Sequence, residues 1–241
     1  MKKIEELQKM IDESENIIAF TGAGISTLSG IKDFRSDDGL YKLAREKYPY
    51  PSEYMLSADC FYRDPKAFYE FYKSELNSLG AKPNIVHEYL KKLEDKGKLK
   101  AIITQNIDGL HRKVGCHNVY ELHGTVYKNY CIKCHKAYSG DYVFQSKGIP
   151  VCECGGTIKP QVVLYGEALP ENEFQKSVEL VEHADMLLVL GTSLTVYPAC
   201  NMVNYFHGKN LVIINRDKTP FDKKADLVIH ADLKDVFCVL R

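Results

Sequence analysis

Short apolar runs alternate with helical patterns along most of this chain, and this alternation restricts its fold more than any other feature. The apolar runs occupy residues 17–20, 100–104, 186–190, 210–214 and 226–230. Apolar side chains at helical spacing occupy residues 2–14, 85–95 and 171–183. Strands that alternate with helices in this way indicate βαβ units. The sequence therefore predicts an α/β fold, with a parallel sheet and helices on both of its faces.

Two stretches interrupt the alternation. Residues 35–78 are rich in tyrosine and phenylalanine and contain no apolar strand run, whereas residues 125–159 contain clustered cysteines and glycines. We expect these insertions to pack together as a smaller domain, one as a helical module and the other as a metal module. The larger, sheet-forming domain then consists of residues 1–34, 79–124 and 160–241.

Length and charge limit the classes of function. The 241 residues suffice for one large domain that carries a small one. There are 32 basic and 32 acidic side chains, and this balance argues against a nucleic-acid partner bound through a broad basic surface. The longest apolar stretch, residues 186–190, falls far short of the roughly 20 residues that span a membrane. Because no export signal is visible, we expect a cytoplasmic protein without a membrane partner.

Four of the eight cysteines form the most specific pattern in the chain. They have the spacing C-x2-C, seventeen residues, C-x-C, and are Cys131, Cys134, Cys152 and Cys154. In a chain without an export signal, such a cluster favours a metal site over two disulfides. Four thiolates complete the tetrahedral shell of zinc and leave no open position, so the predicted Zn2+ is structural.

Small and polar residues follow four of the predicted strands. They lie in residues 22–26, 104–109, 191–194 and 215–217. Each segment alone is also explained by an ordinary turn or helix cap, and the first lacks the third glycine of the dinucleotide fingerprint because Thr27 stands there. In open parallel sheets, ligands bind beyond the carboxyl ends of the strands. The four segments together indicate one nucleotide-binding crevice.

One histidine has a position that suggests catalysis. His123 comes where the sheet-forming domain should pass into the metal module, which favours a place in a cleft. An imidazole there could act as a general base near neutral pH. The other seven histidines are interpreted as structural.

Taken in order, these segments resemble the sirtuin family. The matching runs are residues 22–26, 30–36, 104–111, 123–124, the four clustered cysteines, 165–167 and 191–194. The resemblance extends from about residue 5 to the C-terminus with the motif order preserved, and the short chain is similar to compact prokaryotic members. It implies a Rossmann-like NAD-binding domain beside a small domain that carries zinc.

The resemblance implies NAD-dependent removal of acyl groups, usually acetyl, from lysine side chains of proteins or peptides. In that family the acyl oxygen attacks C1′ of the nicotinamide ribose, nicotinamide leaves, and the motif histidine helps to deprotonate the ribose 2′-hydroxyl. The products are free lysine and O-acetyl-ADP-ribose. Such chemistry needs positioning and a water-poor pocket more than a strong nucleophile.

The resemblance also assigns roles to individual residues. His123 would be the base, and Asn106 would orient the reactive ribose and a water. Gln105, Ile107 and Asp108 would line the nicotinamide pocket. The remaining cofactor contacts would come from Gly22, Ala23, Gly24, Thr27, Asp33, Phe34, Arg35, Gly191, Thr192, Ser193, Asn215 and Asp232.

In the sirtuin family the substrate peptide adds as a strand between two loops. The matching contacts here would be Val163, Tyr165, Gly166, Glu167 and Val196. Tyr165 departs from the phenylalanine that is frequent in the family. Members that remove succinyl groups carry Tyr-x-x-Arg, whereas the matching segment here, residues 72–75, ends in Glu75. We therefore expect a neutral acyl group such as acetyl, because Glu75 would repel a negative one.

Three alternatives stay open, of which nucleic-acid binding through the metal module is the third; a solvated surface explains its lysines equally well, and these are Lys128, Lys133, Lys136 and Lys147. The same nicotinamide cleavage could pass ADP-ribose to a side chain, which would make the chain a protein ADP-ribosyltransferase. A non-catalytic module that binds zinc and a nucleotide, or a protein partner, is the second alternative, although the presence of His123 and Asn106 favours an enzyme.

Overall fold

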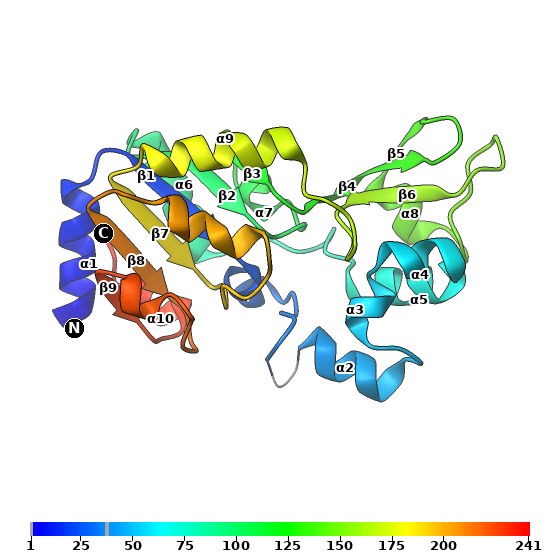
Figure 1. The fold of residues 1–241 in the computed structure, drawn as a ribbon, viewed down its shortest axis with the longest axis horizontal. Helices are drawn as coiled ribbons and strands as arrows, with labels where there is room; N and C mark the ends of the chain where they lie inside the picture. Colours follow the sequence, from blue (N-terminus) through cyan, green and yellow to red (C-terminus); the bar gives the residue numbers. More distant parts are fainter. Residues whose placement is uncertain (1, 37–38) are drawn as a thin grey trace.

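The computed structural model describes residues 2–36 and 39–241. In these residues the chain forms two units that lie side by side in Figure 1. The larger unit is built around a six-stranded sheet with the strand order β3-β2-β1-β7-β8-β9, and the smaller around a three-stranded sheet with the order β5-β4-β6. Both ends of the chain lie on the larger unit (Figure 1).

All neighbouring strands of the larger sheet run parallel. The strands are β1 Ile17–Thr21, β2 Leu99–Thr104, β3 Val119–Glu121, β7 Met186–Leu190, β8 Asn210–Ile214 and β9 Leu227–Ile229. β1, β7 and β8 are buried at every residue, which explains their continuous apolar sequences. The five predicted runs form strands, and β3 is an additional strand that the sequence pattern did not indicate.

Helices cover both faces of this sheet. One face shares a core with α1 Lys2–Glu13, α6 Ile85–Asp95 and α10 Leu233–Phe237, and the other with α9 Glu171–Glu182 and the 3-10 helix η3 Ala199–Tyr205. The shorter helices of this unit are α7 Leu110–Lys113, η1 Ala23–Ile25, η2 Thr27–Ser29 and η4 Asp222–Lys224. The predicted α/β fold with a parallel sheet and helices on both faces is confirmed. Across the described residues, every helix is too short or too polar to cross a lipid bilayer.

The start of α6 connects this helix to the turn after β1. Asn84 caps the helix, because its side chain accepts a hydrogen bond from the Val86 amide and the His87 ring accepts one from the Asn84 amide. The Asn84 amide group also donates to the Ile25 carbonyl and to Ser29 Oγ, each at 2.8 Å. One side chain therefore holds both the helix and the turn.

The smaller unit joins residues of both predicted insertions in one hydrophobic core. Its helices are α2 Leu40–Lys47, α3 Ser52–Met55, α4 Ala58–Arg63, α5 Pro65–Glu75 and α8 Gly140–Gln145. Its strands are β4 Gly124–Cys131, β5 Ala137–Ser139 and β6 Ile158–Val162. The aromatic side chains of α5, Phe68, Tyr69, Phe71 and Tyr72, are buried in this core. β4 and β6 pair antiparallel and extend from the larger unit into the smaller one (Figure 1), and β4 ends at Cys131.

Candidate active site

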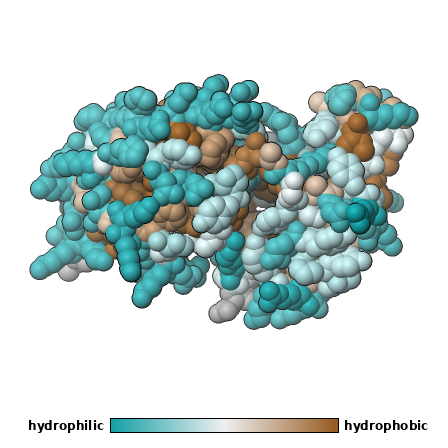
Figure 2. All heavy atoms as spheres, in the orientation of Figure 1, coloured by the Kyte–Doolittle hydropathy of each residue, from teal (hydrophilic) through white to brown (hydrophobic). Residues whose placement is uncertain are grey.

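A cleft of about 1000 Å³ lies between the carboxyl edge of the larger sheet and the smaller unit. Figure 2 shows the two units meeting at a groove on one face of the molecule. All residues predicted to bind the cofactor, to catalyse or to contact the substrate line this cleft. They are Gly22, Ala23, Gly24, Thr27, Asp33, Phe34, Arg35, Gln105, Asn106, Ile107, Asp108, His123, Val163, Tyr165, Gly166, Glu167, Gly191, Thr192, Ser193, Val196, Asn215 and Asp232. The structure brings them together in one place, and their individual roles stay predictions.

The turn after β1 lies directly against the end of β7. Gly22 donates a backbone hydrogen bond to the Leu190 carbonyl at 3.0 Å, and Gly24 donates one to the Gly191 carbonyl at 2.8 Å. A Cβ atom at Gly24 would lie 2.8 Å from the Gly191 Cα, which is too close for any side chain. Glycine is therefore required for the close approach of the two strand ends that forms the floor of the cleft.

Asn106, Ser26 and Asp108 form a buried hydrogen-bonded network at the end of β2. Asn106 Nδ2 donates to the Gly22 carbonyl at 3.0 Å and to Ser26 Oγ at 3.1 Å. Ser26 Oγ donates in turn to Asp108 Oδ2 at 2.6 Å. Burial raises the pKa of Asp108, although its hydrogen bonds from Ser26 and from the Leu110 amide oppose that shift. Because both amide hydrogens of Asn106 are engaged, its carbonyl oxygen is the group it can offer to a ligand.

His123 lies between β3 and β4, where the chain passes from one unit to the other. Its Nδ1 is 2.8 Å from the carbonyl oxygen of Gln105. A carbonyl can only accept, so Nδ1 carries the hydrogen and Nε2 is left as the basic nitrogen. Burial lowers the pKa of His123 below its ordinary value of 6.5, and the bond to Gln105 opposes this shift. The imidazole is therefore neutral at physiological pH and ready to accept a proton.

Polar side chains from other strand ends complete the wall on the side of the larger sheet. Gln105 Nε2 donates to Thr192 Oγ1 at 2.9 Å and so connects the ends of β2 and β7. Asn215 directly follows β8. Asp232 caps α10 by accepting a hydrogen bond from the Lys234 amide. Its capping function and its place in the cleft are compatible, since a carboxylate has two oxygens.

The loop before α2 is folded on itself. Asp33 Oδ1 accepts hydrogen bonds from the Arg35 amide at 3.0 Å and from the Ser36 amide at 2.8 Å. The Phe34 ring meets the Tyr41 ring edge to face at 5.9 Å. The Arg35 guanidinium lies 5.3 Å from the centre of the same Tyr41 ring. Tyr41 is thus the residue on which this loop packs.

The segment after β6 is held by backbone hydrogen bonds on both sides of the cleft. Val163 donates to the His123 carbonyl at 2.9 Å. Tyr165 donates to the Leu56 carbonyl and accepts from the Ala58 amide, both at 3.0 Å. The segment therefore has a fixed position relative to His123.

Glu167 belongs to an ion pair that closes the same segment. Its Oε2 accepts a hydrogen bond from the Leu164 amide at 2.9 Å and lies 3.1 Å from Lys159 Nζ. The Lys159 side chain is only 5% exposed, and a buried ammonium group requires such a partner. Lys159 and Glu167 together fix the shape of the segment from inside.

Glu75 lies in the cleft wall at the end of α5 and is already paired. Its side chain is 5% exposed and lies 3.0 Å from Lys47 Nζ and 3.4 Å from Lys32 Nζ. Burial alone would raise its pKa, but hydrogen bonds from Tyr48, Lys47 and Ser74 lower the pKa of Glu75 to about 2. The predicted repulsion of a negative acyl group is thus offset by two cations.

Tyr72 belongs to the aromatic core. Its ring stacks between two phenylalanine rings, its side chain is fully buried, and its hydroxyl has no hydrogen-bond partner in the described part of the chain. The tyrosine of the sequence segment 72–75 therefore points away from the cleft, whereas Glu75 lines it.

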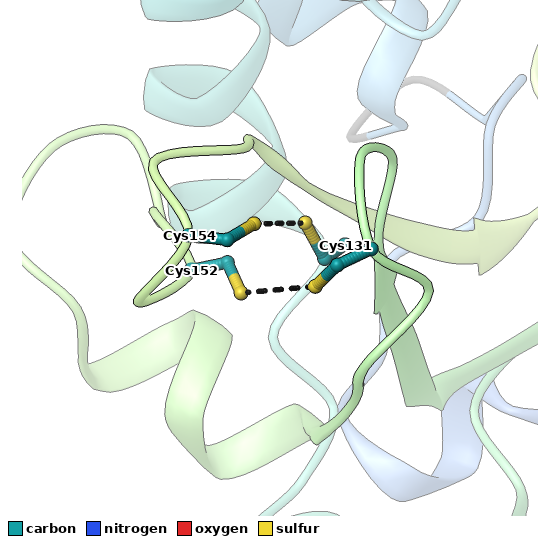
Figure 3. A group of neighbouring side chains, drawn as sticks. Cys131, Cys152 and Cys154 are labelled. Atoms are coloured by element: carbon teal, nitrogen blue, oxygen red, sulfur yellow. Dashed lines mark hydrogen bonds between the residues drawn. The ribbon is translucent and has the colours of Figure 1, made fainter.

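The four clustered cysteines gather at the far end of the β4–β6 pair. Their Sγ atoms all lie within 4.8 Å of one another. Cys131 Sγ lies 3.5 Å from Cys154 Sγ, and Cys134 Sγ lies 3.5 Å from Cys152 Sγ. Figure 3 draws the contact between Cys131 and Cys154 as a dashed line. Thiolates around a tetrahedral zinc are about 3.8 Å apart, given a Zn–S bond of about 2.3 Å. The four side chains thus fit the predicted zinc site, and they lie outside the cleft residues.

Sequence reasoning assigned no role to three residues that hold the site together, Ser26, Tyr41 and Lys159. Ser26 is the last residue of the matched run 22–26, so the motif could have indicated a role for it in the site. Tyr41 and Lys159 act through side-chain partners that only the fold brings to them. Local spacing carries no signal for such contacts.

Comparison with known proteins agrees with this geometry. The model of the Sir2 family matches residues 22–198, which include the glycine turn, the Asn106 network, His123 and the four cysteines. The chain belongs to the Sir2 family. Both the match and the fold place it with the sirtuins, so the resemblance found in the sequence is confirmed.

Relatives of this Sir2 family member are similar over nearly their whole length. A protein of Clostridium acetobutylicum named "NAD-dependent protein deacetylase" is 50% identical over 231 residues, which cover 95% of this chain and 94% of that protein. A solved Sir2 complex with deacetylated p53 peptide and 3′-O-acetyl ADP-ribose has a TM-score of 0.89 and 40% identity, covering 98% of this chain and 96% of the other. A Sir2 complex with p53 peptide and NAD+ has a TM-score of 0.86 and 39% identity, covering 98% and 95%.

Proposed function

We propose that this chain is an NAD-dependent protein-lysine deacetylase. It transfers the acetyl group of an acetylated lysine to ADP-ribose and releases nicotinamide, O-acetyl-ADP-ribose and the free lysine. The observation that carries this proposal is a single cleft of about 1000 Å³ that joins His123, with Nε2 free to act as base, to the Asn106 network and the glycine turn. The name of the Clostridium acetobutylicum relative and the ligands in the two Sir2 complexes support it.

The cleft residues fit NAD. A glycine turn after a buried parallel strand lets a pyrophosphate approach the backbone, and Ala23 and Thr27 line the cleft next to it. Hydroxyl and amide groups of Thr192, Ser193 and Asn215 suit ribose and phosphate oxygens. When bound, NAD supplies an electrophilic ribose carbon with nicotinamide as leaving group.

The protein's own contribution is positioning and one proton transfer. Ser26 and Gly22 fix the side-chain amide of Asn106. Its carbonyl oxygen accepts a hydrogen bond from a ribose hydroxyl and so orients the sugar. His123 Nε2 takes a hydroxyl proton, and the Gln105 carbonyl keeps the ring in the required tautomer and stabilises the imidazolium that forms. Phe34, packed on Tyr41, covers the cleft and excludes water.

Acetylated lysine-containing proteins or peptides are the partners we propose. Their backbone would add beside Val163, Tyr165, Gly166 and Glu167 on one side and Val196 on the other. Recognition through backbone groups tolerates many sequences, so the acyl-lysine is the determinant rather than the residues around it.

The division of labour between the units follows from the same proposal. Residues 1–34, 79–124 and 160–241 would bind NAD, and residues 35–78 and 125–159 would form the small domain. Cys131, Cys134, Cys152 and Cys154 would hold structural Zn2+ as thiolates. We propose a cytoplasmic location, because all eight cysteines are free and a four-thiolate site suits a reducing compartment.

Mass spectrometry of an acetyl-lysine peptide incubated with NAD tests the function. The unaltered chain should remove acetyl only when NAD is present and produce O-acetyl-ADP-ribose. His123→Ala should lose this activity, whereas His207→Ala, which removes an exposed histidine outside the cleft, should keep it.

Two other results would contradict the proposal, and each would identify a different function. Release of nicotinamide with the peptide still acetylated and ADP-ribose attached to a protein side chain would identify an ADP-ribosyltransferase. Binding of NAD without any turnover of acylated peptides would identify a non-catalytic nucleotide-binding module.

A further inference from the structure

Tyr41 and Tyr165 meet beside the cleft through their hydroxyl groups. The two oxygens are 2.8 Å apart, although the residues are 124 positions apart in the sequence. Tyr41 lies on α2, and Tyr165 lies in the segment after β6. Burial raises the pKa of Tyr165, so its hydroxyl keeps its hydrogen at neutral pH. The contact is a hydrogen bond between two phenol hydroxyls.

Tyr165 is firmly held on the peptide side of this contact. Its backbone pairs with Leu56 and Ala58 in a short parallel bridge. Its neighbour Leu164 is bound by the Glu167 carboxylate, which is itself paired with buried Lys159. The direction of the Tyr165 side chain is therefore set by the segment that would bind the peptide.

Tyr41 is the anchor on the other side. Its amide donates to the Phe34 carbonyl at 3.0 Å, and the preceding amide, Leu40, donates to the Asp33 carbonyl at 2.9 Å. Its ring contacts the Phe34 ring, and the Arg35 guanidinium lies over it. A contact that holds Tyr41 in place therefore also holds residues 33–35, which line the cofactor side of the cleft.

We propose that Tyr165 is a positioning residue, whose hydroxyl holds the loop of residues 33–35 through Tyr41 and thereby couples peptide binding to binding on the cofactor side. This inference rests on the proposed function for the identity of the two ligands. A phenylalanine at position 165 lacks the hydroxyl and breaks this connection. A neutral hydrogen bond of ordinary strength is equivalent to an effect of about two- to tenfold on an equilibrium.

Hydrogen exchange in the ligand-free chain tests the contact without reference to any activity. Tyr165→Phe and Tyr41→Phe should each increase exchange of the Leu40 and Tyr41 amides about two- to tenfold. Tyr62→Phe removes a phenol that is 62% exposed and serves as the matched control, with no change at these amides. Unchanged exchange in Tyr165→Phe would overturn the proposal.

Calorimetric titration with ADP-ribose tests the coupling. In the unaltered chain, saturating acetyl-lysine peptide should strengthen ADP-ribose binding, and Tyr165→Phe should reduce that strengthening about two- to tenfold. Tyr41→Phe and Tyr165→Phe break the same hydrogen bond. The double variant should therefore lose no more of the coupling between peptide and ADP-ribose binding than either single variant. If the fold reductions in coupling of the two single variants multiplied in the double variant, the proposal would be overturned.

Failure of the proposed function would look different. If the unaltered chain bound neither acetyl-lysine peptide nor ADP-ribose, the deacetylase proposal and the coupling would both fall. The exchange measurement would still decide whether Tyr165 positions the loop, since it uses no ligand.

Discussion

The ring of His123 donates a hydrogen bond of 2.8 Å from Nδ1 to the backbone carbonyl of Gln105, and burial lowers the pKa of that ring below 6.5. A base must be neutral to accept a proton, so protonation inactivates it. We expect kcat/KM for an acetyl-lysine peptide to be constant above the ordinary histidine pKa and to fall as the pH drops through the lowered value. A pH profile from about 5 to 8 measures this.

The variant His123→Ala provides the control for this profile. Its kcat should be about 10²- to 10⁴-fold lower, and the acidic decline should be absent from the remaining activity. A decline that already begins above the ordinary value of 6.5 would assign the base to another group.

Removal of the Ser26 hydroxyl should weaken both stability and cofactor binding. Ser26→Ala deprives the buried Asp108 carboxylate of a donor at 2.6 Å and Asn106 of an acceptor. We expect the free energy of unfolding to fall by about 1–3 kcal/mol and the KM for NAD to rise. Denaturant titration and steady-state kinetics measure the two effects.

Ser52→Ala is the matched control for this experiment. Ser52 is fully buried like Ser26, but it lies outside the cleft. Its loss should leave the KM for NAD unchanged. If both variants changed this KM equally, the network around Asp108 would have no specific role in binding NAD.

Acetyl-lysine peptides should be turned over at least about tenfold faster than their succinyl counterparts. A succinyl carboxylate entering near Glu75 finds Lys32 and Lys47 already paired, and the Tyr72 hydroxyl is buried away from the cleft. Glu75→Gln frees both ammonium groups and should raise succinyl turnover relative to acetyl turnover. Succinyl turnover by the unaltered chain at or above the acetyl rate would contradict this prediction.

Purified protein should contain about one zinc ion per chain by elemental analysis. Cys152→Ser should lower that content, and removal of the metal by a chelator should lower the Tm and then the activity, because β4 connects Cys131 to the residue after His123. Cys238→Ser, which alters an exposed cysteine outside the cluster, should change neither quantity. Full metal content in both variants would exclude the cluster as the zinc site.

The clearest predictions were the strands buried at every residue, such as β7, because a continuous apolar run such as residues 186–190 is visible without a fold. β3 Val119–Glu121 is three residues long with one buried position, so its sequence shows neither a run nor an alternation. The irregular register between β4 and β6 likewise conceals the smaller sheet from pattern reasoning.

The cleft residues were predictable for a similar reason. They lie at strand ends or in matched runs, so topology places them together. The bonds that orient them were not predictable: Ser26 and Asp108 are 82 positions apart, and Tyr41 and Tyr165 are 124 apart. The packing of the folded chain determines which side chains meet over such separations, and the spacing of residues within a short sequence segment does not reveal it.

β4 begins next to His123, and β6 ends next to Val163, where the Val163 amide binds the His123 carbonyl. The spacing of these two residues is therefore set at the near end of the strand pair. The cysteine cluster gathers at the far end of the pair, where β4 ends at Cys131. Insertions that leave the four cysteines in place are separated from the reacting groups by the length of two strands, so this end can acquire extra residues, labels or fused modules during evolution or engineering while the chemistry is conserved.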